Sequence, residues 1–370
     1  MSGRSFFKKI YNRIIGWFGA VISVALLISY LSPYVSPEDI WWIQLFGLAY
    51  PITLILFLLI SFIVFFTKRK YFWLMFVIFG LGFPIHTKYL SFGSETAKEE
   101  RTNEIKITSF NVRAFDVYNW IYEDKQTAEQ AFISFIERDS SDILCMQEFV
   151  SKNRISDHMS ISKIKKAGNF DFFKEKISIR NGKKLGVGLS IFSKYPIINS
   201  GEIGKEKDIY SHFVDLRINN DTVRIYNTHL KSIRFQQDEY SLFDENSSSN
   251  KDYSRRVEGL LKKLKNAYPT RLDESTSIIE NAKKSPYKSI ICGDFNDPPT
   301  SYTYSLFNDQ FQDAFRETNY GIGRSYAGKI PAGRIDYIFF SKGISAYQFD
   351  IHTKKVMSDH YPISLTFALE

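Results

Sequence analysis

Residues 289–296 read Ser-Ile-Ile-Cys-Gly-Asp-Phe-Asn, and this stretch decides the class of fold. Its first four residues form a short apolar run typical of a buried strand, and a glycine, an aspartate and an asparagine follow closely. A rigid sheet fixes polar groups at strand ends, where the adjoining loops stay open to a substrate. The stretch therefore predicts an α/β protein with a functional site at the end of this strand.

Seven other short apolar runs, rich in β-branched and aromatic residues, predict further strands. Several are continuous rather than alternating, which indicates sheets that are covered on both faces. Residues 127–138, 253–267 and 271–284 have helical patterns. Together these segments predict one α/β domain over residues 104–370. The further strands are expected at residues 105–110, 143–146, 188–192, 213–218, 223–227, 335–340 and 363–367.

Polar signatures recur at or beside the ends of these strands. Carboxylate and amide oxygens are hard ligands that suit Mg²⁺ or Mn²⁺. Two histidines beside such a metal suit the proton transfers and charge stabilisation of phosphoryl chemistry. The set therefore predicts a divalent-metal site that acts on a phosphate ester. The signatures are Ser-Phe-Asn at 109–111, Gln-Glu at 147–148, Asn-Thr-His-Leu at 227–230, Gly-Asp-Phe-Asn at 293–296, Arg-Ile-Asp at 334–336 and Ser-Asp-His at 358–360.

In this order the six signatures resemble those of the endonuclease/exonuclease/phosphatase superfamily, which has the DNase-I-like fold. The resemblance covers about residues 105–369. It implies a four-layer α/β sandwich, in which two packed mixed sheets are flanked by helices and the site lies at one end. It also implies a hydrolase of phosphodiester or phosphomonoester bonds in DNA, RNA, inositol phosphates or sphingomyelin.

The resemblance assigns roles to individual residues. Glu148 matches the acid that binds the divalent metal, and Asn111 helps to position metal and phosphate. Asp294 matches the residue that orients or deprotonates the attacking water, and Asn296 hydrogen-bonds the phosphate. The residues that match the two histidines on the scissile phosphate are His229 and His360.

Four further residues belong to the expected site. Asp336 is expected to hold His360 in the tautomer that catalysis needs, with a structural pairing to Arg334 as the alternative. Asp359 is a second candidate metal ligand. Arg113 stands where some nucleases of the superfamily carry an acid, which disfavours a second metal and offers a cation for a substrate phosphate. Arg334 is the other candidate substrate-binding residue.

Both cysteines and the remaining histidines are expected to be structural. Cys145 and Cys292 lie within apolar strand runs, where a free cysteine behaves as a small buried hydrophobe. The sequence has no CxxC pair that would indicate a zinc site or a redox motif. The histidines outside the signatures are His86, His158, His212 and His352.

The first ninety residues differ from the rest of the chain in charge and hydropathy. They hold eight of the 48 Lys and Arg but two of the 40 Asp and Glu, so they carry +6 of the net charge of +8. The near-neutral remainder argues against a basic face for DNA. Uncharged runs at 14–37 and 40–67 exceed the ~20 residues that cross a bilayer, and a third at 71–87 is at the short limit. We expect a transmembrane anchor at residues 1–90, with about three helices at 14–32, 43–66 and 71–88.

Basic residues set the expected orientation of this anchor. Four precede the first run and three fill positions 68–70, whereas the loop between the first two runs has none. By the positive-inside rule, three spans put the catalytic domain outside the cytoplasm, after a polar linker at 91–103. This predicts an integral membrane protein of a bacterial inner membrane. The alternatives are two spans, with a cytoplasmic domain, and a cleaved signal peptide, although no cleavage site follows the first run.

A long polar insert at residues 232–251 follows His229 directly. It is too long for an ordinary connection, so it is expected either to overhang the site and shape substrate choice or to be a disordered surface loop. Basic residues at 231, 234, 255 and 256 could meet an anionic substrate there or could be solvated surface charges.

The leading hypothesis is a membrane-anchored phosphoesterase that uses Mg²⁺, with Mn²⁺ as the alternative metal. A lipid headgroup or another small phosphodiester is the favoured substrate, because the domain is near-neutral and tethered to a bilayer. The runner-up is an extracytoplasmic nuclease acting on DNA or RNA. The alternative from a non-enzymatic class of protein is a catalytically inactive membrane-bound binding module. The expected partners are the lipid bilayer and the phosphodiester substrate, and no protein partner is inferred.

Overall fold

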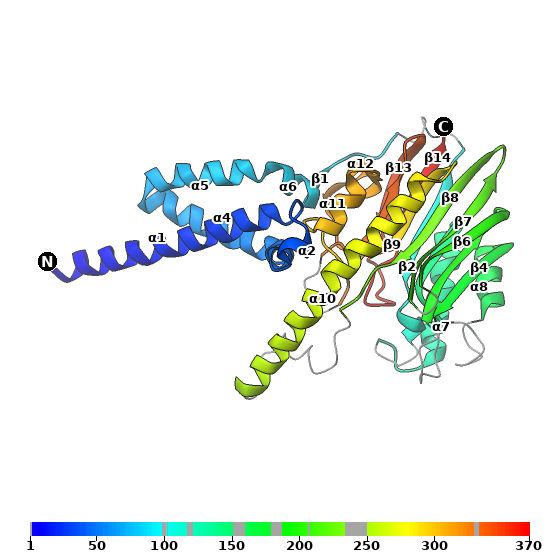
Figure 1. Cartoon of the computed structure of the whole chain (residues 1–370), viewed down its shortest axis with the longest axis horizontal. Coiled ribbons are helices and arrows are strands. Elements are labelled where there is room, and N and C mark those ends of the chain that lie inside the picture. The colour runs from blue at the N-terminus through cyan, green and yellow to red at the C-terminus, as the bar shows by residue number, and fades with distance from the viewer. Residues whose placement is uncertain are drawn as a thin grey trace.

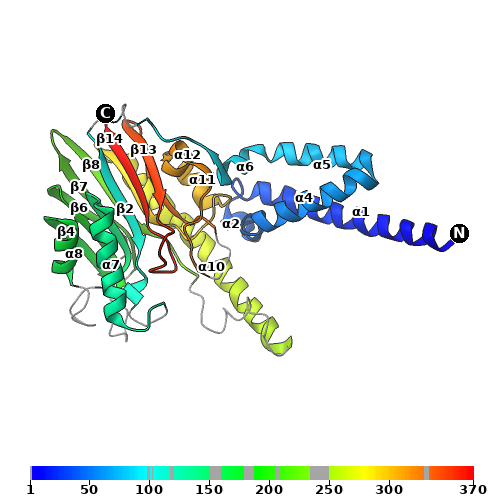
Figure 2. The same ribbon diagram turned by 180° about the vertical axis from the view of Figure 1, so that it is seen from behind.

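The computed structural model has two parts, a helical region and an α/β body (Figure 1). It describes residues 2–97, 101, 103–116, 121–150, 160–178, 187–205, 208–233, 250–328 and 333–370. The helical region consists of residues 2–89 and projects from one flank of the body, and Figure 2 shows the same arrangement from behind.

Two six-stranded mixed sheets form the centre of the body. The first has the strand order β13-β14-β2-β3-β5-β4, and the second has the order β10-β12-β9-β8-β7-β6. One central pair in each sheet is parallel, β2 with β3 and β8 with β9. Parallel neighbours need a long crossover, which is made by α7 (Lys125–Asp139) in the first sheet and α10 (Asn250–Lys283) in the second.

The strands of the first sheet are β2 (Ile105–Asn111), β3 (Ile143–Val150), β4 (Phe172–Ser178), β5 (Val187–Ser193), β13 (Ile344–Ile351) and β14 (Ile363–Leu369). Those of the second are β6 (Ile197–Lys205), β7 (Asp208–Ile218), β8 (Asp221–His229), β9 (Lys288–Asp294), β10 (Gln312–Asp313) and β12 (Asp336–Phe340). All eight predicted strands are present, several of them longer than predicted.

The body has four layers, in the order helix, sheet, sheet, helix. Aliphatic side chains and both cysteines fill the space between the sheets, which confirms that the cysteines are buried core residues. α7 and α8 (Ile161–Gly168) cover the outer face of the first sheet through phenylalanines such as Phe132. α10 and α11 (Tyr302–Asn308) cover the second sheet, with Ile278 and Phe307 in the contact. The predicted four-layer sandwich is therefore confirmed.

α10 corrects the predicted helix boundaries. Two helices were expected on either side of Pro269, but one continuous helix runs through it. A proline inside a helix removes one N–H donor, and its ring clashes with the carbonyl four residues earlier, so it usually kinks or ends the helix. Here the neighbouring Ala267, Tyr268 and Arg271 are all buried against the body, and this packing holds the helix together across the proline.

The chain passes along the helical region three times (Figure 1). α1 (Ser2–Leu31) runs toward the body, α4 (Tyr50–Thr67) runs away from it, and α5 (Arg69–Leu81) with α6 (Phe83–Tyr89) returns. The short helices α2 (Pro37–Ile40) and α3 (Ile43–Leu48) connect α1 to α4. Residues such as Leu26, Phe57 and Ile85 form a common core from these helices.

Two helical segments in the described part of the chain, Ile10–Leu31 and Tyr50–Thr67, are long and apolar enough to cross a membrane. The third predicted helix, at 71–88, is instead two helices that meet at Gly82. A side chain at Gly82 would collide with the ring of Tyr30, because an added Cβ would lie 2.2 Å from Cζ. The absence of a side chain at Gly82 therefore lets α1 pack closely against the returning pass.

The predicted linker at 91–103 begins later than expected. β1 (Leu90–Phe92) pairs with β11 (Tyr320–Ile322) of the body, and Ser91 is buried in the contact. Further along, the Thr96 amide donates to the Tyr347 carbonyl at 3.1 Å. The first residues of this segment are thus a docked strand, because their backbone groups find partners in the body.

The helical region makes direct polar contacts with the body. Thr300 Oγ1 donates to the carbonyl of Gly47 at 2.7 Å, and the Tyr302 amide donates to Gln44 Oε1 at 3.2 Å. Buried Lys88 donates from Nζ to Ser305 Oγ at 2.8 Å. These bonds join the ends of α3 and α6 to the segment that follows β9.

Candidate active site

Asp294, the last residue of β9, is the centre of the candidate site. Its buried carboxylate oxygen Oδ2 accepts a hydrogen bond from Asn111 Nδ2 at 3.0 Å. The same oxygen lies 3.6 Å from Nε2 of His229 and 3.6 Å from Nε2 of His360. Four side chains that are far apart in sequence therefore meet at one oxygen atom.

Strand register explains this convergence. Asp294 pairs with His229 on the parallel neighbour β8 and with Asp336 on the antiparallel neighbour β12. In the other sheet, Asn111 pairs with Gln147 at the ends of parallel β2 and β3. The carboxyl ends of parallel strands meet at one edge of a sheet, so the signatures found in the sequence gather at one end of the sandwich.

Gly293 allows the close approach of β8 and β9 beside Asp294. Its φ is +144°, and an added Cβ would lie 1.8 Å from the carbonyl oxygen of Thr228. The following turn is held by Asn296, which has a φ of +55° and whose amide donates to Asp294 Oδ1 at 2.9 Å. Asn296 Nδ2 also donates to the Leu230 carbonyl at 3.1 Å, which ties the loop after β9 to the loop after β8.

Asp336 contacts His360 directly. Its carboxylate oxygens lie 2.9 and 3.1 Å from His360 Nδ1, so Nδ1 carries the proton of this bond and Nε2 faces Asp294. Asp336 receives no contact from Arg334 in this arrangement, and its own amide donates to Ser325 Oγ at 2.9 Å. Burial alone would lower the pKa of His360, but the carboxylates of Asp336 and Asp294 outweigh it and raise that pKa to about 10. The imidazole is therefore a cation at neutral pH.

Glu148 lies at the mouth of the same site. It stands at an irregularity of β3 with a φ of +51°, and 32% of its side chain is exposed. Its Oε1 lies 3.9 Å from Nε2 of His229. Glu148 is therefore a carboxylate that is open to solvent and close to the buried group around Asp294.

The donor set fits a hard divalent cation. Ligand atoms of Asp294, Asp336 and His360 lie within 4.8 Å of one another. Asp336 and His360 already bind each other, and the Asp294 carboxylate accepts hydrogen bonds from Asn111 and from the Asn296 amide, which leaves Glu148 as the carboxylate better suited to a metal. Oxygen donors suit Mg²⁺ or Mn²⁺, whereas both thiols are buried in the core between the sheets.

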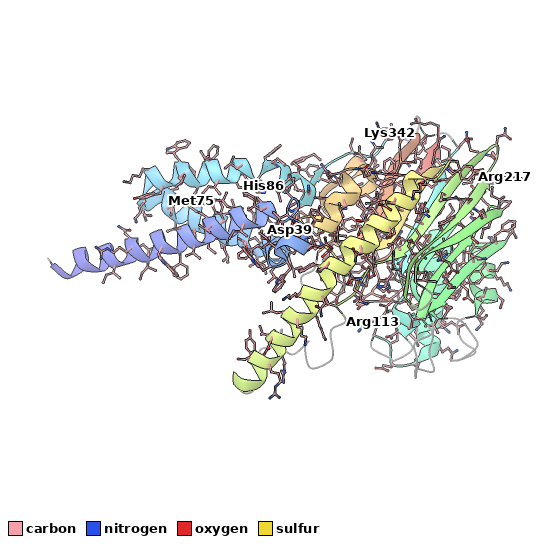
Figure 3. All side chains as sticks on the ribbon, viewed as in Figure 1. Asp39, Met75, His86, Arg113, Arg217 and Lys342 are labelled. Atoms are coloured by element: carbon pink, nitrogen blue, oxygen red, sulfur yellow. The ribbon has the colours of Figure 1, made fainter. Side chains whose placement is uncertain are left out.

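Arg113 and Asp359 face each other beside this site. The Nε of Arg113 lies 3.4 Å from Asp359 Oδ2, and the Arg113 amide donates to Asn111 Oδ1 at 3.1 Å. Both side chains are partly exposed. Figure 3 places Arg113 at one end of the body and Lys342 near the other. The predicted substrate contact of Arg113 and the predicted metal contact of Asp359 remain predictions.

Arg334 is a structural residue, and its predicted substrate-binding role is wrong. It is 2% exposed, and its Nη1 lies 2.6 Å from Asp313 Oδ2. Its guanidinium also stacks over the rings of Phe315 and Tyr337, and Nη2 donates to the Lys88 carbonyl at 3.2 Å. A cation that is enclosed by these groups has no free face for a substrate phosphate.

Several supporting residues escaped the sequence analysis. Tyr326 packs its ring edge-to-face on His360, with ring centroids 5.2 Å apart. Arg271 and Glu274 of α10 bind the loop that follows His229, where Glu274 Oε2 accepts from the Lys231 amide at 2.7 Å. Arg271 also binds Asp297, in the loop that contains Asn296. Their partners lie far away in sequence, and neither belongs to a recognisable motif, so no local signal could have found them.

Two protein-family models match the chain. The model of the Endonuclease/Exonuclease/phosphatase family matches residues 108–360, and that of a domain of unknown function matches residues 12–89. The first match covers most of the α/β body, and the second coincides with the helical region. A search of curated proteins found no match.

Solved structures share the fold of the body. The endonuclease/exonuclease/phosphatase from Bacteroides vulgatus is 16% identical with a TM-score of 0.52, over 73% of this chain and 100% of that one. The catalytic domain of human nocturnin with a bound sulfate anion is 16% identical with a TM-score of 0.51, over 72% and 94%. The endonuclease/exonuclease/phosphatase from Beutenbergia cavernae DSM 12333 is 12% identical with a TM-score of 0.51, over 72% of both chains.

Proposed function

The chain belongs to the endonuclease/exonuclease/phosphatase family of metal-dependent phosphoester hydrolases, and from this premise we propose that it is a membrane-anchored phosphodiesterase. Its proposed substrate is a lipid headgroup or another small phosphodiester. This chemistry is supported by one observation: the side chains of Asn111, His229 and His360 converge on one carboxylate oxygen of Asp294.

In the proposed mechanism, Asp294 orients the attacking water and takes its proton. Its hydrogen bonds from Asn111 and from the Asn296 amide fix the direction of its carboxylate. His360, held as a cation by Asp336, donates from Nε2 to a phosphoryl oxygen and stabilises the charge that develops there. His229 and Asn296 are proposed to bind the same phosphoryl group.

The metal in this proposal is Mg²⁺ or Mn²⁺, held by Glu148 and Asn111. When bound, such an ion would neutralise charge on a non-bridging phosphate oxygen and act as a Lewis acid. The amide of Asn111 is shared between Asp294 and the backbone of Arg113. Asn111, proposed for the metal, and Asp294, proposed for the water, therefore share a hydrogen bond.

The preference for a membrane substrate rests on where the site lies. Thr300, which bonds to Gly47 of the helical region, follows Asp294 by six residues in the chain. Arg334, which bonds to the Lys88 carbonyl, precedes Asp336 by two. Segments that carry the chemistry therefore continue directly into segments that contact the helical region, so a site beside the bilayer surface is the natural consequence of anchoring.

Anchoring is supported by the side chains of the helical region. Large apolar residues such as Phe62, Phe66 and Leu81 are more than 60% exposed, which is costly in water and favourable in lipid. The helices share a core of their own, which a cleaved signal peptide would not provide. With three passes, the basic residues at 68–70 and the body lie at opposite ends of the region, and the proposed catalytic domain is extracytoplasmic.

A substrate screen tests the activity. The full chain, purified in detergent, is assayed against an aryl phosphodiester, sphingomyelin, a phosphoinositide, RNA and duplex DNA with Mg²⁺ present. We expect turnover of the aryl and lipid diesters and none by the Asp294→Asn variant. Cleavage of nucleic acid alone, with a steep loss of affinity between about 50 and 200 mM salt, would replace the proposal by a nuclease.

A reporter fusion tests the side of the membrane. Alkaline phosphatase folds only outside the cytoplasm, so its activity when fused after residue 100 would support three spans. Fluorescence of a cytosolic reporter at the same position would instead mean two spans and a cytoplasmic domain.

A further inference from the structure

α10 has two halves of different character. The half at residues 267–283 packs on the second sheet, with Ala267, Ile278, Ile279 and Ala282 buried. The half at residues 250–266 stands clear of the sheets at the lower edge of Figure 1, and it extends on the side of the helical region. Figure 2 shows the same separation from behind. The projecting half is therefore not needed to cover the sheet.

The balance of basic and acidic residues in the helix changes at the same point. The projecting half has six Lys and Arg against two acids, whereas residues 267–284 have three of each. Arg255, Lys262 and Lys265 are exposed, and so are two large apolar side chains among them, Tyr253 at 50% and Leu261 at 38%. Basic residues interleaved with exposed aromatic and leucine side chains are typical of helices that lie at a lipid surface.

The base of the projecting half sits at the body-facing end of the helical region. Lys265 Nζ lies 5.9 Å from the ring centroid of Trp41, which follows α2 directly. Tryptophans favour the boundary between hydrocarbon and water, and Trp42 beside it is exposed. From Lys265 to Asn250 the helix extends about 22 Å at ~1.5 Å per residue, enough to run along or into a headgroup layer.

We propose that residues 250–266 of α10 form a contact surface for the anionic headgroups of the bilayer in which the helical region sits. This rests on the proposed membrane anchoring. Positive charge on a tethered helix at a bilayer boundary meets lipid phosphates at high local concentration. A nucleic acid would use the charges but not the exposed apolar side chains of Tyr253 and Leu261, which favour lipid.

The contact would fix the orientation of the active site. Arg271 and Glu274, on the packed half of the same helix, bind the loops after β9 and β8. A rigid helix that touches both the headgroups and these loops holds the site at one height and angle above the membrane. The substrates selected are then phosphodiesters within reach of that surface.

A fluorescent label tests the contact. Both native cysteines are buried, so Leu261→Cys in the full chain gives one reactive position for an environment-sensitive dye. The protein is placed in nanodiscs of phosphatidylcholine, with or without phosphatidylglycerol, that contain headgroup spin labels. We expect quenching only with the anionic lipid, and release on raising salt from about 0.1 to about 1 M, which shortens the screening length from ~10 to ~3 Å.

Charge variants give the decisive comparison. Arg255→Gln with Lys262→Gln and Lys265→Gln should weaken the contact equilibrium roughly 100-fold, since each charge contributes about fivefold at an anionic surface. The matched control is Lys283→Gln with Lys284→Gln and Lys342→Gln, three exposed lysines away from the projecting half, and it should be quenched like the parent.

Other outcomes overturn the inference. Quenching that does not depend on lipid charge excludes an anionic headgroup contact, and so does the absence of quenching. Shielding of the label by an RNA or DNA oligonucleotide, without quenching by lipid, assigns the surface to nucleic acid. Failure of the chain to insert into nanodiscs refutes the proposed membrane anchoring as well. Hydrolysis of an aryl diester, measured on the same samples, reports separately on the proposed chemistry and should be unchanged in both triple variants.

Discussion

Arg271 and Asp297 form a buried ion pair that holds two loops of the active site in place. Arg271 Nη1 lies 2.5 Å from Asp297 Oδ1, and its Nε donates to the Lys231 carbonyl at 2.7 Å. Both side chains are almost completely buried. Asp297 follows Asn296, and Lys231 lies two residues after His229, so one guanidinium connects the loop that contains Asn296 to the loop that follows His229.

Arg271→Met tests this arrangement. The substitution keeps an apolar stem of similar reach but leaves the Asp297 carboxylate buried without its cation. Breaking a buried pair in this way costs about 3–5 kcal/mol of unfolding free energy, because one charge stays uncompensated. A displacement of about 1 Å in a catalytic group can cost about 100-fold in rate, so kcat should fall even under conditions where the variant is folded.

The loss of stability should depend on pH. Burial raises the pKa of Asp297, and Arg271 opposes this rise. Without Arg271, the folded state holds a proton on Asp297 to higher pH than the unfolded state does. Stability falls with rising pH wherever the folded state binds more protons. The difference in unfolding free energy between Arg271→Met and the parent should therefore be small in acid and grow as pH rises above the ordinary pKa of an aspartate.

The assay is thermal and denaturant unfolding of the full chain in detergent, with hydrolysis of an aryl diester alongside. Arg271→Met with Asp297→Asn should be more stable than Arg271→Met alone, because no buried charge is left unpaired. Arg217→Met is the control: this arginine is exposed at another end of the body (Figure 3), and its loss should stay within about 0.5 kcal/mol. An Arg271→Met variant as stable and active as the parent would refute the reasoning.

Four further predictions follow from the site and its support. Asp294→Asn should lower kcat by orders of magnitude with an unchanged circular dichroism spectrum, and parent-like turnover would exclude Asp294 as the water-orienting group. EDTA should abolish hydrolysis and added Mg²⁺ or Mn²⁺ should restore it; activity that persists in EDTA contradicts the proposed metal. Burial lowers the pKa of His212 to about 3, and neither of its ring nitrogens has a partner. The unfolded chain therefore binds a proton at His212 that the folded chain does not, so the free energy of unfolding should fall by about 1.4 kcal/mol per pH unit below about pH 6.5. The His212→Leu variant should reduce this slope in acid unfolding curves. Gly293→Ala should separate β8 from β9 because its Cβ would meet the Thr228 carbonyl, and a variant that keeps both melting temperature and kcat would show that the strands can adjust.

The strands that the sequence predicted are the interior ones. Each interior strand lies between two neighbours and under helices, so its residues form short apolar runs. The strands that were missed in the two main sheets are β4, β6, β10 and β13, which are the four sheet edges. Edge strands carry charges and glycines that discourage pairing with other chains, as in Phe-Phe-Lys-Glu-Lys-Ile-Ser of β4. Their sequences therefore lack the pattern that identifies interior strands.

The residues that gather at the candidate site could be predicted from sequence, but the partner of Arg334 could not. Asp294, His229 and Asp336 stand at strand ends in one register, so a correct assignment of strands brings them together. Arg334 stands only two positions before Asp336, and both are charged. The partner of Arg334 is Asp313 in another element, and no local pattern distinguishes an arginine bound there from one that faces a substrate.

The site depends on how the two sheets are aligned. Asn111 comes from the first sheet and Asp294 from the second, so their 3.0 Å bond requires a fixed alignment of the sheets. Aliphatic packing, which fills most of the space between the sheets, is not directional and leaves small shifts inexpensive. Below the site the contact is polar instead: Asn227 of the second sheet bonds to the side chain of Gln147 and to the carbonyls of Met146 and Ser190 in the first. Buried hydrogen bonds are lost when their partners shift, so this group of side chains fixes the alignment that the bond between Asn111 and Asp294 requires.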